Sequence, residues 1–229
     1  MIPAILHYES RDALALDLTE IVTGELEAAL AARGRATLAV PGGTTPGPFL
    51  AGLSLAPLDW ARISVMLTDE RFVPENSPRS NTRLLRETLL QNAAAGATAI
   101  PFFAEAAAPE DVLASLTAGV AAALPLDVCV LGMGADMHTA SLFPGADRLA
   151  EALGAAAPPL LPMRAPGAPE PRLTLTAPVL RSAGSLHILI TGVEKQMALA
   201  AALEAPSAET APVRAVLDGP VPVTVHYAD

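Results

Sequence analysis

The sequence predicts an α/β fold in which a doubly wound, mostly parallel sheet carries helices on both faces, together with a short edge-strand region. Short, mostly apolar runs, typical of strands covered on both faces, alternate along the chain with segments of helical periodicity. The clearest runs cover residues 37–40, 63–67, 126–131 and 186–191. The chain shows no internal repeat and no clean linker, so we expect one domain over residues 1–229.

The first half of the chain predicts three helices. The first lies between Ser10, a suitable N-cap, and Gly34, which suits the left-handed residue that ends many helices. Its apolar residues recur at the 3.6-residue helical spacing. A short helix is expected over residues 46–53, and a further helix over residues 82–90 with Asn81 as its cap.

The second half contains a proline-rich connection between regular elements. Six prolines fall within residues 154–171, so we expect irregular structure there, with one short edge strand at residues 160–163. Helices are expected over residues 110–123 and 194–203, and strands over residues 173–176 and 221–226.

Composition and charge limit the classes of partner. The chain carries 24 acidic and 14 basic side chains, and its formal net charge of −10 disfavours nucleic acid and anionic membranes. No apolar run approaches the ~18 residues of a membrane span, and no secretory signal pattern is expected at the start. The single cysteine, Cys129, falls within a predicted strand, where a buried apolar role is expected. We therefore expect a cytoplasmic protein without disulfides.

Four of the predicted strands are followed by residues suited to binding a ligand. Residues 41–46 (Pro-Gly-Gly-Thr-Thr-Pro) offer free backbone N–H groups and hydroxyls, and residues 68–71 (Thr-Asp-Glu-Arg) offer two carboxylates and a guanidinium. Residues 132–138 place an aspartate and a histidine on a glycine-rich bend that opens toward a helix, and residues 192–195 end in a lysine. One Asp-x-His pair alone is weak evidence for catalysis. Because parallel strands bind ligands at their carboxyl ends, the four segments together predict one pocket for an anionic small molecule.

Several common site types are disfavoured. Met137 occupies the third glycine position of a dinucleotide-binding G-x-G-x-x-G pattern, and the glycine-rich loop at residues 41–46 lacks the lysine of a P-loop. No G-x-S-x-G nucleophile motif occurs in the sequence. A metal at Asp136 and His138 would need further ligands, with residues 69–70 as the candidates, so we favour a site without metal.

Five groups of residues, in this order and spacing, resemble motifs of the 6-phosphogluconolactonase family. They are residues 41–46, 69–71 with 80–81, 132–145, 172–174 and 192–195. The resemblance extends from about residue 36 to residue 200 and implies the fold shared with glucosamine-6-phosphate deaminases and ribose-5-phosphate isomerases. It also implies hydrolysis of 6-phospho-D-glucono-1,5-lactone to 6-phospho-D-gluconate, a step of the pentose phosphate pathway, without a metal or a cofactor.

Two other functions are alternatives. In the deaminase pattern a glutamate follows the histidine by five residues, whereas this chain has Phe143 at that position, which favours the lactonase. A non-catalytic sugar-phosphate-binding domain of a transcription regulator would carry a basic DNA-binding helical module. The first 35 residues instead predict an acidic amphipathic helix.

Lactone hydrolysis requires an activated water, a stabilised oxyanion and a proton for the departing ring oxygen. His138 suits both proton transfers, because an imidazole can take up and return a proton near neutral pH. Asp136 or Asp69 would orient His138 or hold substrate hydroxyls. Arg71 would polarise the lactone carbonyl or grip the phosphate.

The 6-phosphate is expected among backbone N–H groups, hydroxyls and basic side chains, which are the groups that bind anions. The residues assigned to it are Gly42, Gly43, Thr44, Thr45, Arg172 and Lys195, the only lysine in the chain.

One residue departs from the lactonase pattern. The family motif usually contains Asp-Gly-His, whereas this chain has Asp136-Met137-His138. A methionine at positive φ would cost on the order of 1 kcal/mol or more. We therefore expect Met137 to have ordinary backbone angles, with its thioether lining the pocket.

Overall fold

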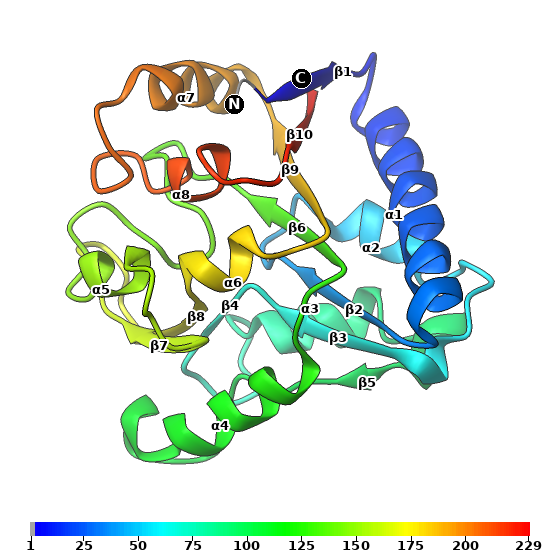
Figure 1. The fold of residues 1–229 in the computed structure, drawn as a ribbon, viewed down its shortest axis with the longest axis horizontal. Coiled ribbons are helices and arrows are strands. Elements are labelled where there is room, and N and C mark those ends of the chain that lie inside the picture. The colour runs from blue at the N-terminus through cyan, green and yellow to red at the C-terminus, as the bar shows by residue number, and fades with distance from the viewer. Residues whose placement is uncertain (1–2) are drawn as a thin grey trace.

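The computed structural model describes residues 3–229. Within them, seven strands form a main sheet in the order β1-β10-β9-β6-β2-β3-β5, and each neighbouring pair is parallel (Figure 1). The strands are β1 (Ala4–His7), β2 (Ala36–Val40), β3 (Ile63–Leu67), β5 (Thr98–Ala99), β6 (Val128–Gly132), β9 (Ser185–Thr191) and β10 (Val223–Ala228). The predicted mostly parallel sheet is confirmed.

Helices cover both faces of the main sheet, as predicted. α1 and α2 lie on one face, and α6, α7 and α8 lie on the other (Figure 1). The helices are α1 (Arg11–Arg33), α2 (Gly47–Leu53), α3 (Asn81–Thr88), α4 (Pro109–Ala123), α5 (Leu149–Leu153), α6 (Ala177–Arg181), α7 (Val193–Glu204) and α8 (Arg214–Leu217), with 3-10 turns η1 (Trp60–Arg62) and η2 (Asn92–Gly96).

The long helix α1 begins and ends where the sequence predicts. Ser10 Oγ accepts a hydrogen bond from the Ala13 N–H at 3.1 Å, and Gly34 ends the helix with φ 70°. The buried face of α1 consists of Leu14, Leu18, Val22 and Leu26.

The start of α3 differs from the prediction. The helix begins at Asn81, and Ser80 is its cap, with Oγ accepting the Arg83 N–H at 3.2 Å. The Asn81 side chain instead donates to the backbone carbonyl of Asp69 at 2.9 Å. Asn81 was therefore the wrong cap, because the serine before it meets the same chemical requirement and has extended backbone angles.

A second, three-stranded antiparallel sheet lies beside the main one. Its order is β4 (Asp69–Arg71), β8 (Arg172–Leu175) and β7 (Leu160–Met163), so the predicted short edge strand at residues 160–163 is present. The strand predicted at residues 173–176 belongs to this small sheet, and residues 69–71 are an additional strand. The register places Arg71 opposite Arg172, which joins two segments that are far apart in sequence.

The segment after β6 also differs from the expectation. Residues 133–148 form turns and irregular structure, and the next helix is α5 at Leu149–Leu153. Cys129 is fully buried in β6, as expected. No helix within residues 3–229 is long and apolar enough to cross a bilayer.

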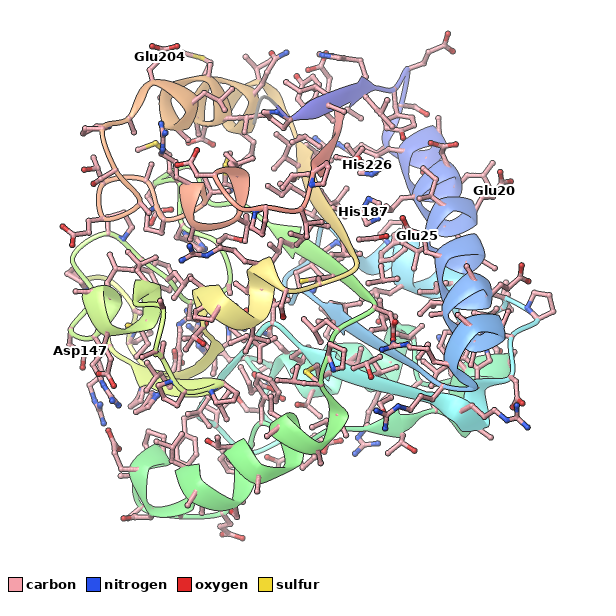
Figure 2. The ribbon with its side chains drawn as sticks, viewed as in Figure 1. Glu20, Glu25, Asp147, His187, Glu204 and His226 are labelled. Carbon is pink, nitrogen blue, oxygen red and sulfur yellow. The ribbon has the colours of Figure 1, made fainter. Side chains whose placement is uncertain are left out.

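A buried polar group joins α1 to the main sheet. His187 on β9 and His226 on β10 lie side by side, with Nδ1 of His187 3.0 Å from Nε2 of His226. Glu25 of α1 approaches His187, with Oε2 2.9 Å from Nε2 (Figure 2). On the other side, Nδ1 of His226 lies 2.9 Å from the hydroxyl of Tyr8. These contacts make the face beneath α1 partly polar.

Candidate active site

The adjacent strands β9, β6, β2 and β3 open at their carboxyl ends onto one cavity of about 310 Å³. This is the edge of the sheet at which the sequence predicts a site. The predicted site residues that line the cavity are Gly42, Gly43, Thr44, Thr45, Asp69, Arg71, His138, Arg172 and Lys195. The remaining one, Asp136, contacts His138.

His138 and Asp136 form a hydrogen-bonded pair on the bend after β6. Nδ1 of His138 lies 2.5 Å from Oδ1 of Asp136, and the same oxygen accepts the backbone N–H of His138 at 3.3 Å. Burial opposes ionisation of Asp136, but its hydrogen bond with His138 and the imidazole charge prevail and lower the pKa of this carboxyl. An ionised carboxylate at Nδ1 keeps a proton on that nitrogen, which leaves Nε2 available to accept one.

The bend that carries this pair is tight. The Gly134 N–H donates to the His138 carbonyl at 2.9 Å, and the Met137 N–H donates to the Gly134 carbonyl at 3.0 Å. A Cβ on residue 134 would overlap both the imidazole and the Asp136 carboxylate. Glycine at this position therefore provides the room that the pair occupies.

Met137 has the backbone conformation that we did not expect. Its φ is 64°, in the left-handed region, so the expectation of ordinary angles was wrong. The side chain is half-buried against the hydrophobic core, and the methionine that lines the cavity is Met133. Closing the turn between Gly134 and His138 requires this conformation, and methionine adopts it at a cost in strain.

Asp69 has partners other than His138. Its Oδ2 accepts a hydrogen bond from Ser141 Oγ at 2.5 Å and lies 3.6 Å from a terminal nitrogen of the Arg172 guanidinium. Asp69 thus connects β4 both to the segment that follows His138 and to β8.

Glu70 points to the start of α3. Its carboxylate accepts hydrogen bonds from the backbone N–H groups of Asn81 at 2.8 Å and Thr82 at 2.6 Å. It also accepts the hydroxyls of Ser80 at 3.1 Å and Thr82 at 2.7 Å. Fully buried and with these donors, Glu70 stabilises the first turn of α3.

Two arginines lie together in one wall of the cavity. Arg71 donates to the Arg79 carbonyl at 2.5 Å, and the Arg172 guanidinium carbon lies 5.2 Å from the centre of the Phe143 ring. The Nε atoms of Arg71 and Arg172 are buried and lack a hydrogen-bond partner among the described residues. Burial, together with the charge of Arg71, lowers the pKa of Arg172 despite the opposing effect of Asp69. A bound anion would add a partner for the two buried guanidinium groups.

The glycine-rich loop and the lysine also line the cavity. A Cβ on Gly42 would overlap the Asn81 amide, and Gly43 has φ 87°, so both positions favour glycine. Lys195, in the first turn of α7, reaches across the cavity edge and donates to the Met133 carbonyl at 2.6 Å. The loop residues and the Lys195 ammonium group therefore border the same space.

Some residues that line the cavity were not predicted from the sequence as site residues. Asn81, Thr68 and Thr191 line the cavity, and the two threonines directly follow or end predicted strands, a position that could have marked them. The Phe143 ring packs against the His138 imidazole in a tilted arrangement, with 4.1 Å between the ring centres. From the sequence, Phe143 was notable only as the replacement for a glutamate.

Comparison with known proteins agrees with this architecture. The family model for glucosamine-6-phosphate isomerases/6-phosphogluconolactonase matches residues 9–224. The chain belongs to this family. A 6-phosphogluconolactonase of Mesorhizobium japonicum is 48% identical over 224 residues, which are 96% of this chain and 93% of that protein. One of Rhizobium meliloti is 45% identical, covering 96% of this chain and 97% of that protein.

Solved structures of the family have the same fold. A 6-phosphogluconolactonase from Shewanella baltica superposes with a TM-score of 0.96 at 32% identity, covering 99% of this chain and 98% of that one. A monomeric glucosamine-6-phosphate deaminase superposes with a TM-score of 0.76 at 17% identity, covering 98% of this chain and 97% of that one, and shows the shared fold alone. The expected fold relationship with the deaminases is confirmed.

Proposed function

We propose that this protein is an enzyme that hydrolyses 6-phospho-D-glucono-1,5-lactone to 6-phospho-D-gluconate in the pentose phosphate pathway. Relatives named 6-phosphogluconolactonase, up to 48% identical and aligned over most of the chain, support this function. The observation that carries it is the His138–Asp136 pair at the edge of a cavity that also contains two arginines and a lysine. A cytoplasmic location is part of the proposal.

In the proposed mechanism His138 handles both proton transfers. Nε2 takes a proton from water as the water oxygen attacks C1 of the lactone, and Asp136 holds the resulting imidazolium. The tetrahedral oxyanion then collapses, the bond between C1 and the ring oxygen breaks, and the imidazolium returns its proton to that oxygen. We assign the orienting role to Asp136 because it contacts the imidazole, whereas Asp69 contacts Ser141 and Arg172.

The positive groups divide between the reacting carbonyl and the phosphate. We assign Arg71 to the carbonyl oxygen, where a guanidinium stabilises developing negative charge. The phosphate is assigned to Arg172, Lys195 and the loop of Gly42, Gly43, Thr44 and Thr45. No step of this mechanism uses a metal or a cofactor.

The first test is lactonase activity in the presence of EDTA. Product formation would be measured with 6-phosphogluconate dehydrogenase and corrected for spontaneous opening of the lactone. We expect full activity with chelator. Activity that EDTA abolishes and a divalent cation restores would contradict the metal-free mechanism, and release of ammonia from glucosamine 6-phosphate would favour the deaminase alternative.

The second test is His138→Asn, which should lower kcat by roughly 10²- to 10⁴-fold with KM nearly unchanged, the usual effect of removing a general acid–base. His7→Asn is the matched control, because His7 lies on the exposed edge strand β1. Retention of more than about a tenth of wild-type kcat in His138→Asn would assign the base to another group.

A further inference from the structure

The aromatic ring of Phe143 contacts two groups of the proposed machinery at once. Its centre lies 4.1 Å from the centre of the His138 imidazole, with 31° between the ring planes. The Arg172 guanidinium carbon lies 5.2 Å from the same ring centre. His138 lies on the bend after β6 and Arg172 on β8 of the small sheet, so the phenyl ring is a direct structural connection between them.

The backbone around Phe143 restricts where this ring can go. The preceding residue, Leu142, is fully buried and forms an isolated β-bridge with Thr139. The following residue is Pro144, which confines the backbone of residue 143 to extended conformations. A half-buried ring held on both sides in this way is a fixed surface against which the imidazole can pack.

The hydrogen bond that His138 Nδ1 donates to Asp136 does not by itself fix the plane of the imidazole. The imidazole can turn about its Cβ–Cγ bond, and among the side-chain hydrogen bonds of the described residues only the one at Nδ1 opposes this rotation, which moves Nε2 away from the reacting carbon. Stacking against Phe143 limits that rotation. The face of a phenyl ring also attracts cations, so it favours the imidazolium that forms when His138 takes the proton from water.

We propose that Phe143 is a positioning residue of the lactonase reaction, which holds the His138 imidazole at the angle needed for proton transfer and braces Arg172 beside it. This inference rests on the proposed function. It assigns a role to the position where the deaminase pattern has glutamate, since a carboxylate there would approach the histidine as a second charge instead of a flat apolar surface.

The test compares Phe143→Leu with Phe143→Tyr. We expect the leucine variant to lose about tenfold in kcat, because a stacking contact of this kind is worth roughly one power of ten. KM should change less, because Arg172 keeps its contact with Asp69. The tyrosine variant retains the ring and should restore most of kcat. Phe103→Leu is the control, a half-buried phenylalanine that pairs with Phe72 outside the cavity.

A double-mutant comparison separates positioning from general packing. If Phe143 acts through His138, then Phe143→Leu should have almost no effect on kcat when His138 is already asparagine. An undiminished tenfold loss in that background, or an unchanged kcat in the single Phe143→Leu variant, would overturn the proposal. Urea melts would show that each variant compared is folded. If the leucine variant does not fold, Phe143→Met replaces it as the variant without a ring and is compared with Phe143→Tyr in the same experiments.

A readout that does not depend on activity is the ¹⁵N spectrum of the His138 imidazole. The wild type should show the proton predominantly on Nδ1, and Phe143→Leu should show a mixture of the two tautomers. An identical spectrum in the two proteins would overturn the positioning role. Absence of lactonase activity in the wild type would instead refute the proposed function, and the spectrum would still decide whether Phe143 orients the imidazole.

Discussion

The strained backbone at Met137 predicts that glycine at this position gives a more stable protein than alanine. With φ at 64°, any L-residue at this position pays ~1–2 kcal/mol for the left-handed conformation. Glycine adopts this conformation without strain, but it destabilises the folded state by ~0.5–1 kcal/mol relative to alanine because it loses more conformational freedom on folding. Met137→Gly should therefore be more stable than Met137→Ala by about 1 kcal/mol. The two variants lose the same side-chain contacts beyond Cβ, so their difference isolates the backbone.

The assay is denaturant unfolding of both variants with the m-value checked for equality. In a chain of this size, about 1 kcal/mol corresponds to a shift of roughly 2–4 °C in Tm, which is readily measured. Gly24→Ala is the control, because Gly24 lies inside α1 with open space around it, and alanine should stabilise that position. An alanine variant at residue 137 that equals or exceeds the glycine variant in stability would refute the conclusion that the bend is strained.

Three further outcomes are expected. Burial and the neighbouring His187 lower the pKa of His226 to about 4, so as the pH falls this imidazole takes up a proton in the unfolded chain before it does so in the folded one. The free energy of unfolding should therefore fall by about 3 kcal/mol as pH drops from 6.5 to 4, and a urea-melt series should show a smaller fall for His226→Gln. Gly134→Ala should reduce kcat by at least tenfold in the lactonase assay, because the new Cβ displaces the imidazole or the carboxylate that it overlaps; wild-type activity would show that the bend can shift. Lys195→Ala should raise KM by roughly 10- to 150-fold with kcat nearly unchanged, and inorganic phosphate should inhibit the wild type competitively; an unchanged KM would leave the phosphate to the loop and Arg172.

The parts of the fold that could be predicted from the sequence are those with a strong burial pattern. Residues 38–40 and 188–190 are continuously apolar because both faces of their strands are covered, and they lie in β2 and β9. The edge strand β1 was not predicted; Ala4, Ile5 and Leu6 are apolar, but the strand has only four residues and all of them are exposed. The two-residue strand β5 is too short to give one.

The location of the site could also be predicted, but the pairing of its side chains could not. Polar residues at the ends of buried strands must meet at one edge of a parallel sheet, so the sequence was sufficient to bring His138, Arg71 and Lys195 together. Which aspartate orients His138 depends on side-chain directions within the bend. The local turn between Gly134 and His138, with Met137 at positive φ, places the Asp136 carboxylate at Nδ1, and this contact supports our assignment of the orienting role to Asp136.

The alternation within one three-residue strand explains the division of tasks among Asp69, Glu70 and Arg71. Successive side chains of a strand point to opposite faces, so residues 69 and 71 share one side and residue 70 takes the other. Asp69 and Arg71 accordingly line the cavity, while Glu70 is buried at the start of α3. If this segment were a loop, the strand alternation that separates the two carboxyl groups would be absent. Pairing of β4 with β8 therefore does more than hold Arg172 opposite Arg71, because it also keeps one carboxyl group at the cavity and directs the other to the start of α3.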